Sequence, residues 1–298
     1  MLLKTYIFVH FLLILSFKHT PIINSSKKIK LPSQISKSFH SKKYYKIYRS
    51  FITGQKRGID KKIRKSFQSL QIMHLMTPSG LHFSTILFLL VLLRKKLNSK
   101  ILLYSELLLC LIIYFFLPGY YSFRRVALLR ALFIINKQST NYNNKIIFSI
   151  FLCFDIFWGT YSENPMSFFY SSLFLGIIFL SNHKSIYQIS LFFFIAQCFT
   201  AFAMEQHTNL MNIIFSPFMT YLFMGVYPLI SINILFLDFV NYSQWIVEGY
   251  CELVIFLESI SIQYFEVHSG FFIILGFIIL TRKTILLSAS LLIISFVI

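Results

Sequence analysis

The sequence predicts an all-α protein, a polytopic helical membrane protein with broken or re-entrant helices. Three observations indicate this class: 56% of the 298 residues are hydrophobic, only 13% are charged, and the mean hydropathy is +0.69. A soluble domain usually carries about a quarter charged residues and less than half apolar residues. A soluble globular enzyme is therefore nearly excluded. A disordered chain is excluded by its high hydrophobicity, and a disulfide scaffold by its four cysteines.

Apolar runs from residue 72 onward define the expected helices. Several are shorter than the roughly 20 residues that span a bilayer, so we expect half-helices or tilted helices among them. Prolines interrupt the runs, and such breaks are tolerated at membrane depth only where the freed backbone groups face protein or a wet cavity. The expected helical stretches are 72–93, 101–118, 122–136, 146–160, 167–181, 187–204, 211–230, 231–240, 245–265, 270–281 and 284–298.

Two segments precede these helices. Residues 5–17 form a short apolar run behind Lys4, so 1–17 is expected to be a signal sequence or a membrane anchor. Residues 18–65 hold 15 of the 28 basic residues and one acid, Asp60. This basic arm shows no pattern that would build a core, so we expect it to be extended or partly helical at the surface. The membrane domain is then 66–298.

The sharpest motif is the end of the segment LQIMHLMTPSGLH, residues 70–82. The Ser79-Gly80 pair before a helix frees backbone N–H groups, and the partial positive charge of a helix N-terminus favours phosphate. His74 and His82 could hydrogen-bond a phosphate or line a pore. The competing interpretation is a helix kink in which both histidines satisfy nearby carbonyl groups.

The second motif contains Arg124, Arg125 and Arg130 in apolar surroundings. Arginine there is costly unless it faces protein, a cavity or a headgroup, and its planar fork suits phosphate. One competing interpretation is snorkelling of Arg124 and Arg125 to the membrane interface. Another is that Glu106 or Asp155 pairs with a buried arginine such as Arg130, which would make the charges structural.

Together the two motifs resemble the ComEC family of competence proteins, the membrane channel of natural transformation. That family carries a block ending in Ser-Gly-Leu-His, then Tyr-x-x-x-x-Gly and Ser-x-x-Arg-Ala. The sequence departs from the pattern at Leu70, Pro78 and Val126, where Gly, an apolar residue and Ala are usual. The matching positions are His74, Leu75, Ser79, Gly80, Leu81, His82, Tyr114, Gly119, Ser122 and Arg125, and further on Asn164-Pro165, Phe169–Ser172 and Asn212–Pro217.

Two domains that many members of this family carry are not expected in this sequence. Residues 18–65 are too few for the family's OB-like domain, and no His-x-His-x-Asp-His motif marks its metallo-β-lactamase-like nuclease domain. The eight histidines are scattered without the spacing of a zinc site. We therefore expect a transport protein rather than an enzyme, with no metal and no cofactor.

The function that the resemblance implies is a multi-pass channel of the cell inner membrane that passes single-stranded DNA into the cytoplasm. The implied partners are single-stranded DNA, the lipid bilayer, a DNA-receptor protein, a cytoplasmic ATPase and further copies of the chain. The residues expected along the DNA path are His74, Ser79, Gly80, Leu81, His82, Gly119, Ser122, Arg124, Arg125 and Arg130.

The basic arm is expected to collect DNA at the outer surface. The excess of Lys and Arg in cytoplasmic loops places Arg94–Lys100 inside, and alternating spans then leave the arm outside. Each arm cation that meets a phosphate releases a counterion, and the interleaved aromatic residues could stack on unpaired bases. The expected DNA-binding residues of the arm are Lys42, Lys43, Tyr44, Tyr45, Lys46, Arg49, Lys56 and Arg57.

Two other functions compete with the channel. One is a degenerate family member that no longer transports DNA. The other is an intramembrane serine hydrolase, with Ser79 as the nucleophile and His74 or His82 as the base. The Gly-x-Ser-x-Gly environment of many serine hydrolases is absent, because Thr77-Pro78 precedes Ser79.

Overall fold

The structure is a computed structural model, and its described part is helical apart from two very short strands. β1 (Thr208–Asn209) and β2 (Tyr264–Phe265) pair antiparallel. The all-α prediction is confirmed. The structure describes residues 2–17, 31–97, 100–117, 119–180, 185–203, 208–209, 211–234, 240–261 and 264–265.

Most of the expected helices are present within a few residues of their predicted ends. The stretch 72–93 was wrongly predicted as one helix, because the chain is extended at Thr77 before Pro78, and a residue that precedes proline is disfavoured in helical conformation. Within the stretch 231–240, the described residues are the end of an α-helix at 231, a 3-10 turn at 232–234 and the start of the next α-helix at 240, and 270–281 and 284–298 lie outside the described residues. The helices are α1 (Leu2–Phe17), α2 (Ser33–Ser38), α3 (Lys42–Thr53), α4 (Lys61–Ser69), η1 (Met73–Met76), α5 (Gly80–Leu97), α6 (Lys100–Phe116), α7 (Tyr121–Ser139), α8 (Asn144–Trp158), α9 (Pro165–Leu180), α10 (Ile186–Ala203), α11 (Asn212–Ser231), η2 (Ile232–Ile234) and α12 (Val240–Ile260).

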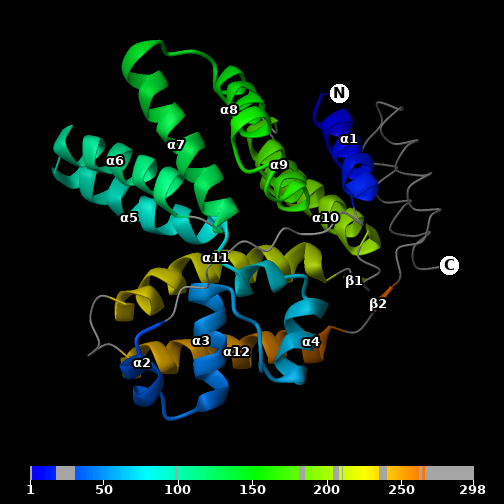
Figure 1. The fold of residues 1–298 in the computed structure, drawn as a ribbon. Coiled ribbons are helices and arrows are strands. Elements are labelled where there is room, and N and C mark those ends of the chain that lie inside the picture. Colours follow the sequence, from blue (N-terminus) through cyan, green and yellow to red (C-terminus); the bar gives the residue numbers. More distant parts are fainter. Residues whose placement is uncertain are drawn as a thin grey trace.

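α11 lies between two layers of helices (Figure 1). On one side, α2, α3, α4, η1 and α12 share a hydrophobic core with α11. On the other side, α5 to α8 form a second core, and α1, α9 and α10 form a third. The start of α5 packs against the core of the first layer through Leu81 and Ile86, which joins the two layers.

The described part of the basic arm, 31–65, is folded, so the expectation of an arm without a core was wrong. Along α3, the buried side chains Tyr44, Ile47, Tyr48 and Phe51 recur every three to four residues, which places them on one face of the helix. The helical spacing of these apolar residues is hard to see in the sequence, because lysines and arginines lie between them. Asp60 caps α4 by accepting hydrogen bonds from the backbone N–H groups of its first turn. The domain division at residue 65 stays a prediction.

α1 packs as an integral helix against α9 and α10. Tyr6 lies over Gly176, where any Cβ would overlap the tyrosine ring, and its hydroxyl donates to the carbonyl oxygen of Ser172 at 2.7 Å. His10 Nε2 is 3.0 Å from the Ser172 hydroxyl oxygen. The assignment of residues 1–17 as a signal sequence or a membrane anchor stays a prediction.

One helical segment in the described ranges, Asn212–Ile234, is both long enough and apolar enough to cross a membrane. Pro165–Leu180 and Gln188–Phe202 are apolar but shorter.

Candidate functional site

The two sequence motifs meet where α5 and α7 begin. A Cβ atom at Gly80 would overlap the Val126 side chain and would lie 3.3 Å from the carbonyl oxygen of Ser122. Only glycine lets the first turn of α5 come this close to α7. Residues that are more than 40 positions apart in the sequence therefore form one helix junction.

His82 holds the start of α5 from inside. Its Nδ1 accepts a hydrogen bond from the backbone N–H of Ser79 at 3.1 Å, and its Nε2 lies 3.1 Å from the carbonyl oxygen of Leu75. A side chain three residues into a helix that reaches back to the residue before it acts as a cap. The His82 ring is fully buried and makes edge contacts with Phe223 and Tyr227 of α11. His82 thus caps the start of α5 and packs it against α11.

The hydrolase interpretation of this motif is not favoured. Ser79 Oγ is 2.8 Å from His82 Nδ1, a distance that would suit a nucleophile and its base. However, both ring nitrogens of His82 are engaged in the caps described above, and none of its surface is exposed. His74, the other candidate base, lies in η1 and is exposed.

A polar contact between α7 and α9 continues the junction. Ser122 Oγ lies 3.4 Å from Ser171 Oγ, and Arg125 Nη2 donates to the hydroxyl of Ser167. Arg125 is 1% exposed, which contradicts snorkelling to the interface. Its Nε donates to the carbonyl oxygen of Tyr121, and its Nη1 has no hydrogen-bond partner among the described residues.

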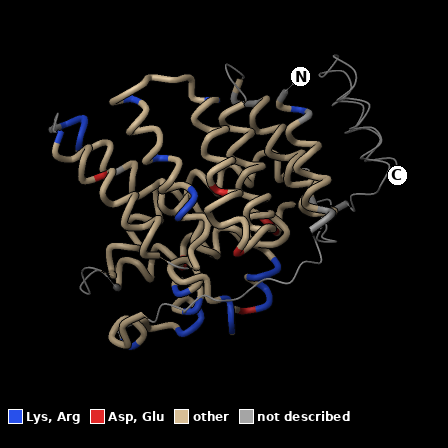
Figure 2. The backbone as a smooth tube through the Cα atoms, turned by 45° about the horizontal axis from the view of Figure 1, so that its top comes forward, with Lys and Arg blue, Asp and Glu red and all other residues tan. Residues whose placement is uncertain are grey.

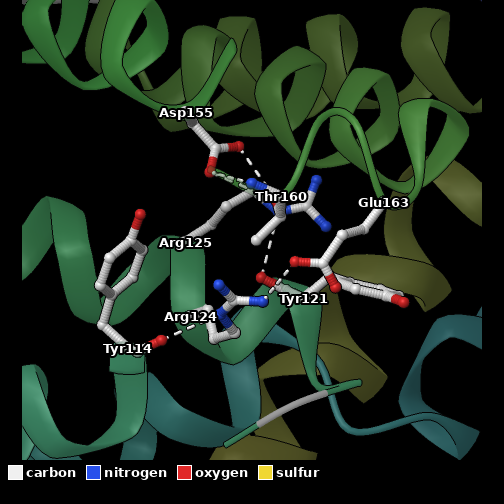
Figure 3. Close-up of polar contacts among 7 residues, drawn as sticks. All are labelled: Tyr114, Tyr121, Arg124, Arg125, Asp155, Thr160 and Glu163. Atoms are coloured by element: carbon white, nitrogen blue, oxygen red, sulfur yellow. Dashed lines mark hydrogen bonds and ion pairs between the residues drawn. The ribbon is translucent and has the colours of Figure 1, made fainter. Parts of the chain in front are cut away.

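Carboxylates lie beside the first two arginines of α7 (Figure 3). Arg124 Nη1 is paired with Glu163 at 2.8 Å, and Arg124 Nε donates to the carbonyl oxygen of Tyr114 at 2.9 Å. Asp155 is fully buried and accepts from the backbone N–H of Thr160 at 2.9 Å. In the close-up, Asp155 and Arg125 point toward the same space beside Thr160.

The third arginine of α7 is part of a charged triad. Glu106 of α6 is 1% exposed and pairs with Arg130 at 2.6 Å and with Arg94 of α5 at 2.7 Å. A buried carboxylate needs such partners because desolvation of an unpaired charge costs several kcal/mol. The predicted alternative in which Glu106 pairs with Arg130 is confirmed. Within the described ranges, no group of three or more His, Cys, Asp and Glu side chains could hold a metal ion.

These pairs change the interpretation of the expected DNA path. Arg124 and Arg130, both expected along the path, are paired with carboxylates in this structure. Two other residues expected along the path have structural surroundings. Gly119 has a φ of 81° in the turn before α7. Leu81 packs against the hydrophobic core of the first layer. The path itself stays a prediction.

The aromatic residues of the arm face inward. Tyr44 is buried and its hydroxyl donates to Glu252 of α12 at 2.9 Å, while Tyr45 is half-buried against Phe39. Phe39, Tyr48 and Phe51 are buried in the core of the first layer. The expectation that this set stacks on DNA bases was therefore wrong for the buried members.

The cations of the arm, in contrast, line its surface. Figure 2 shows Lys and Arg gathered on the layer that holds α3 and α4. Lys42, Lys43 and Arg57 are exposed, whereas Lys46, Arg49 and Lys56 are half-buried. The ion pairs found among the described residues join bundle arginines to bundle acids and include no arm cation.

Sequence reasoning missed Ser167, Ser171 and Glu163 as partners of the motif arginines and serines. A signal was present, because Asn164-Pro165 is a strong helix start and the two serines follow at a four-residue spacing on one helix face. The structure confirms this start, since Asn164 Oδ1 accepts from the Ser167 N–H at 3.0 Å.

Comparison with known proteins gives a match that includes the helix junction of α5 and α7. Residues 51–137 match the family described as Competence protein. The match spans just under a third of the chain, from the end of α3 to α7, and it confirms the predicted resemblance to the ComEC competence core. The similar elements after residue 137 lie outside the match. No curated protein and no solved structure matches the chain.

Proposed function

We infer, from the similarity of residues 51–137 to the Competence protein family, that this chain is the inner-membrane component through which single-stranded DNA enters the cell. The observation that carries the proposal is a contrast in charge. Three bundle arginines, Arg94, Arg124 and Arg130, are paired with carboxylates, whereas no ion pair of the α3 and α4 cations occurs among the described residues.

The contrast has a direct electrostatic consequence. Between Lys42 and Lys65 the chain carries ten Lys and Arg residues and a single acid, Asp60. Asp60 is engaged in capping α4. A predominantly positive surface attracts a polyanion at long range, and binding through phosphates is blind to sequence and sensitive to salt. Because the aromatic residues are mostly buried, we expect phosphate contacts rather than base stacking to supply most of the affinity.

Outward-facing apolar side chains support a multi-pass membrane protein. On α6, Ile101, Phe115 and Phe116 are 69–77% exposed, and on α8 Phe157 and Trp158 are 73% and 75% exposed. Patches of this kind are rare on soluble monomers and are natural against lipid. The helices α5 to α10 hold 15 to 19 residues, which at about 1.5 Å per residue gives roughly 22–29 Å, enough for a thin or locally adapted bilayer.

The proposed route begins at the arm and passes the junction of α5, α7 and α9. The arm is directly adjacent to this junction, since a Cβ at Gly54 would lie 3.1 Å from Pro78 Cδ. Ser122, Ser171 and the unpartnered nitrogen of Arg125 supply polar groups between α7 and α9. A polyanion needs fixed polar groups and water to cross an apolar bilayer. A DNA receptor, a cytoplasmic ATPase and self-association belong to the proposal as partners expected from the family.

A transformation assay tests the proposal. Cells that lack the gene should take up no labelled DNA into a nuclease-resistant state, and the wild-type gene should restore uptake. Replacing Lys42 and Lys43 with Gln should lower uptake about fivefold, because two phosphate contacts are lost. The matched control replaces Lys95 and Lys96, two exposed lysines at the far end of α5, and should leave uptake unchanged. Normal uptake in the deletion strain would show instead that the chain is a non-transporting family member.

A further inference from the structure

Half-buried positive charge lies in and beside the loop between α3 and α4, on Lys56 and on Arg49 of α3. Lys56 is half-buried in this loop, and repulsion from Arg64 adds to burial in lowering the pKa of its ammonium group. A lysine that is partly removed from water beside other cations is costly unless an anion joins it.

The loop is held in one shape around these cations. Gly54 and Gly58 both have positive φ angles, 72° and 80°, which favour glycine. Arg49 Nη2 donates to the carbonyl oxygen of Arg57 at 2.7 Å, so the loop is tied to α3. Lys46 lies across Gly58. A rigid loop loses little conformational entropy when it binds a ligand.

One hydrogen-bond donor on α3, in the side chain that is bonded to this loop, has no acceptor in the part of the chain that the structure describes. Arg49 Nε is buried and has no hydrogen-bond partner among the described residues. No ion pair of Lys56 or Arg64 occurs within the described ranges either. A buried unpaired donor costs about 1–3 kcal/mol, so the arrangement suits an acceptor supplied from outside the chain.

We propose that Arg49, Lys56 and Arg64 form a site for a single phosphate of the backbone of single-stranded DNA, here called the loop phosphate site. The proposal rests on the proposed function and makes it specific, because it singles out one fixed contact among many arm cations. DNA is favoured over a lipid headgroup because the loop adjoins Pro78 at the start of α5 and lies in the region that matches the competence family. A strand held there would be positioned at the helix junction.

Binding of a fluorescein-labelled oligo-dT to the full chain in nanodiscs, measured by anisotropy at several salt concentrations, tests the site. Lys56→Gln should weaken binding about tenfold and lower the logarithmic salt dependence by about 0.7, the value for one lost phosphate contact on a single strand. Lys62→Gln on α4 removes the same charge from an exposed position and should weaken binding less than about twofold. Lys56→Arg should retain binding, and unchanged thermal unfolding of Lys56→Gln excludes misfolding.

Each other outcome has a distinct meaning. If the wild type binds oligo-dT but Lys56→Gln and Lys62→Gln weaken it equally, the loop phosphate site is wrong while the proposed function stands. If the wild type does not bind oligo-dT at all, the proposed DNA-binding role of the arm fails as well. If Lys56→Gln lowers binding to phosphatidylglycerol vesicles and leaves oligo-dT binding intact, the site is a lipid site and the proposal is overturned.

Discussion

At the N-terminus of α5, a missing side chain decides whether two helices can meet. Gly80 lies against Val126 and the backbone of Ser122, and these contacts bring the two sequence motifs together in a single junction. Gly176 of α9 is packed just as closely, against Tyr6, whereas nothing lies within 4 Å of a Cβ built at Gly225 or Gly249.

Replacing Gly80 with Ala should therefore destabilise the protein by about 1–3 kcal/mol through overpacking. Val126→Ala in the same chain should recover part of the loss, because it removes the overlapping atoms. Gly249→Ala is the matched control and should be neutral or slightly stabilising, since alanine favours helix over glycine. Thermal unfolding in detergent measures all three, and an unperturbed Gly80→Ala protein would contradict the close packing.

The charged triad offers a test at the same scale. Arg130→Gln should destabilise the fold by about 1–3 kcal/mol, because the buried Glu106 loses one of its two ion-pair partners and is left with Arg94. Adding Glu106→Gln should recover part of the stability. DNA uptake should follow stability in both variants. Uptake that stays lost in a stably folded double variant would show that Arg130 contacts DNA directly.

At the scale of elements, α3 and α4 depend on α11 and α12. Phe51 is fully buried and contacts Phe67 of α4, Phe223 of α11 and Tyr250 of α12. The helices of the arm are short, with 12 and 9 residues, and isolated helices of that length are marginal in water. Their order therefore comes from tertiary packing.

Phe51→Ala should lower stability by about 3–5 kcal/mol and release α3 and α4 from the core. Limited proteolysis of the purified protein should then cut the arm faster. Tyr45→Ala on the same helix serves as the control, because Tyr45 is half-buried and its loss should change the cleavage rate little. Equal cleavage of the wild type and Phe51→Ala would support an arm that is already detached.

At the scale of the whole molecule, the arm and the lysines at the end of α5 should face opposite sides of the membrane. α5 begins beside the arm and ends at Leu97, so its 18 residues separate the two by about 27 Å at 1.5 Å per residue. That length is close to the thickness of the hydrocarbon core.

Cysteine labelling tests this arrangement. Ser41→Cys should react with an impermeant maleimide in intact spheroplasts, whereas Lys96→Cys should react only after the membrane is opened. Both variants are made with Cys153→Ser, because Cys153 is exposed on α8. The reverse pattern of labelling would invert the topology and place the DNA-binding arm in the cytoplasm.

The sequence by itself determined the helical class, most helix positions, the uneven charge and the resemblance of residues 51–137 to the competence family. These features are local, since apolar runs, prolines and charged clusters each act over a few residues. Only the tertiary structure decided which charges are available to a ligand. Glu106, Glu163 and the α7 arginines are distant in sequence, and their pairing arises when α5, α6, α7 and α9 pack together. The same packing buries the aromatic face of α3 and leaves its lysines in solvent, because amphipathic helices bury the face that a neighbouring core can cover.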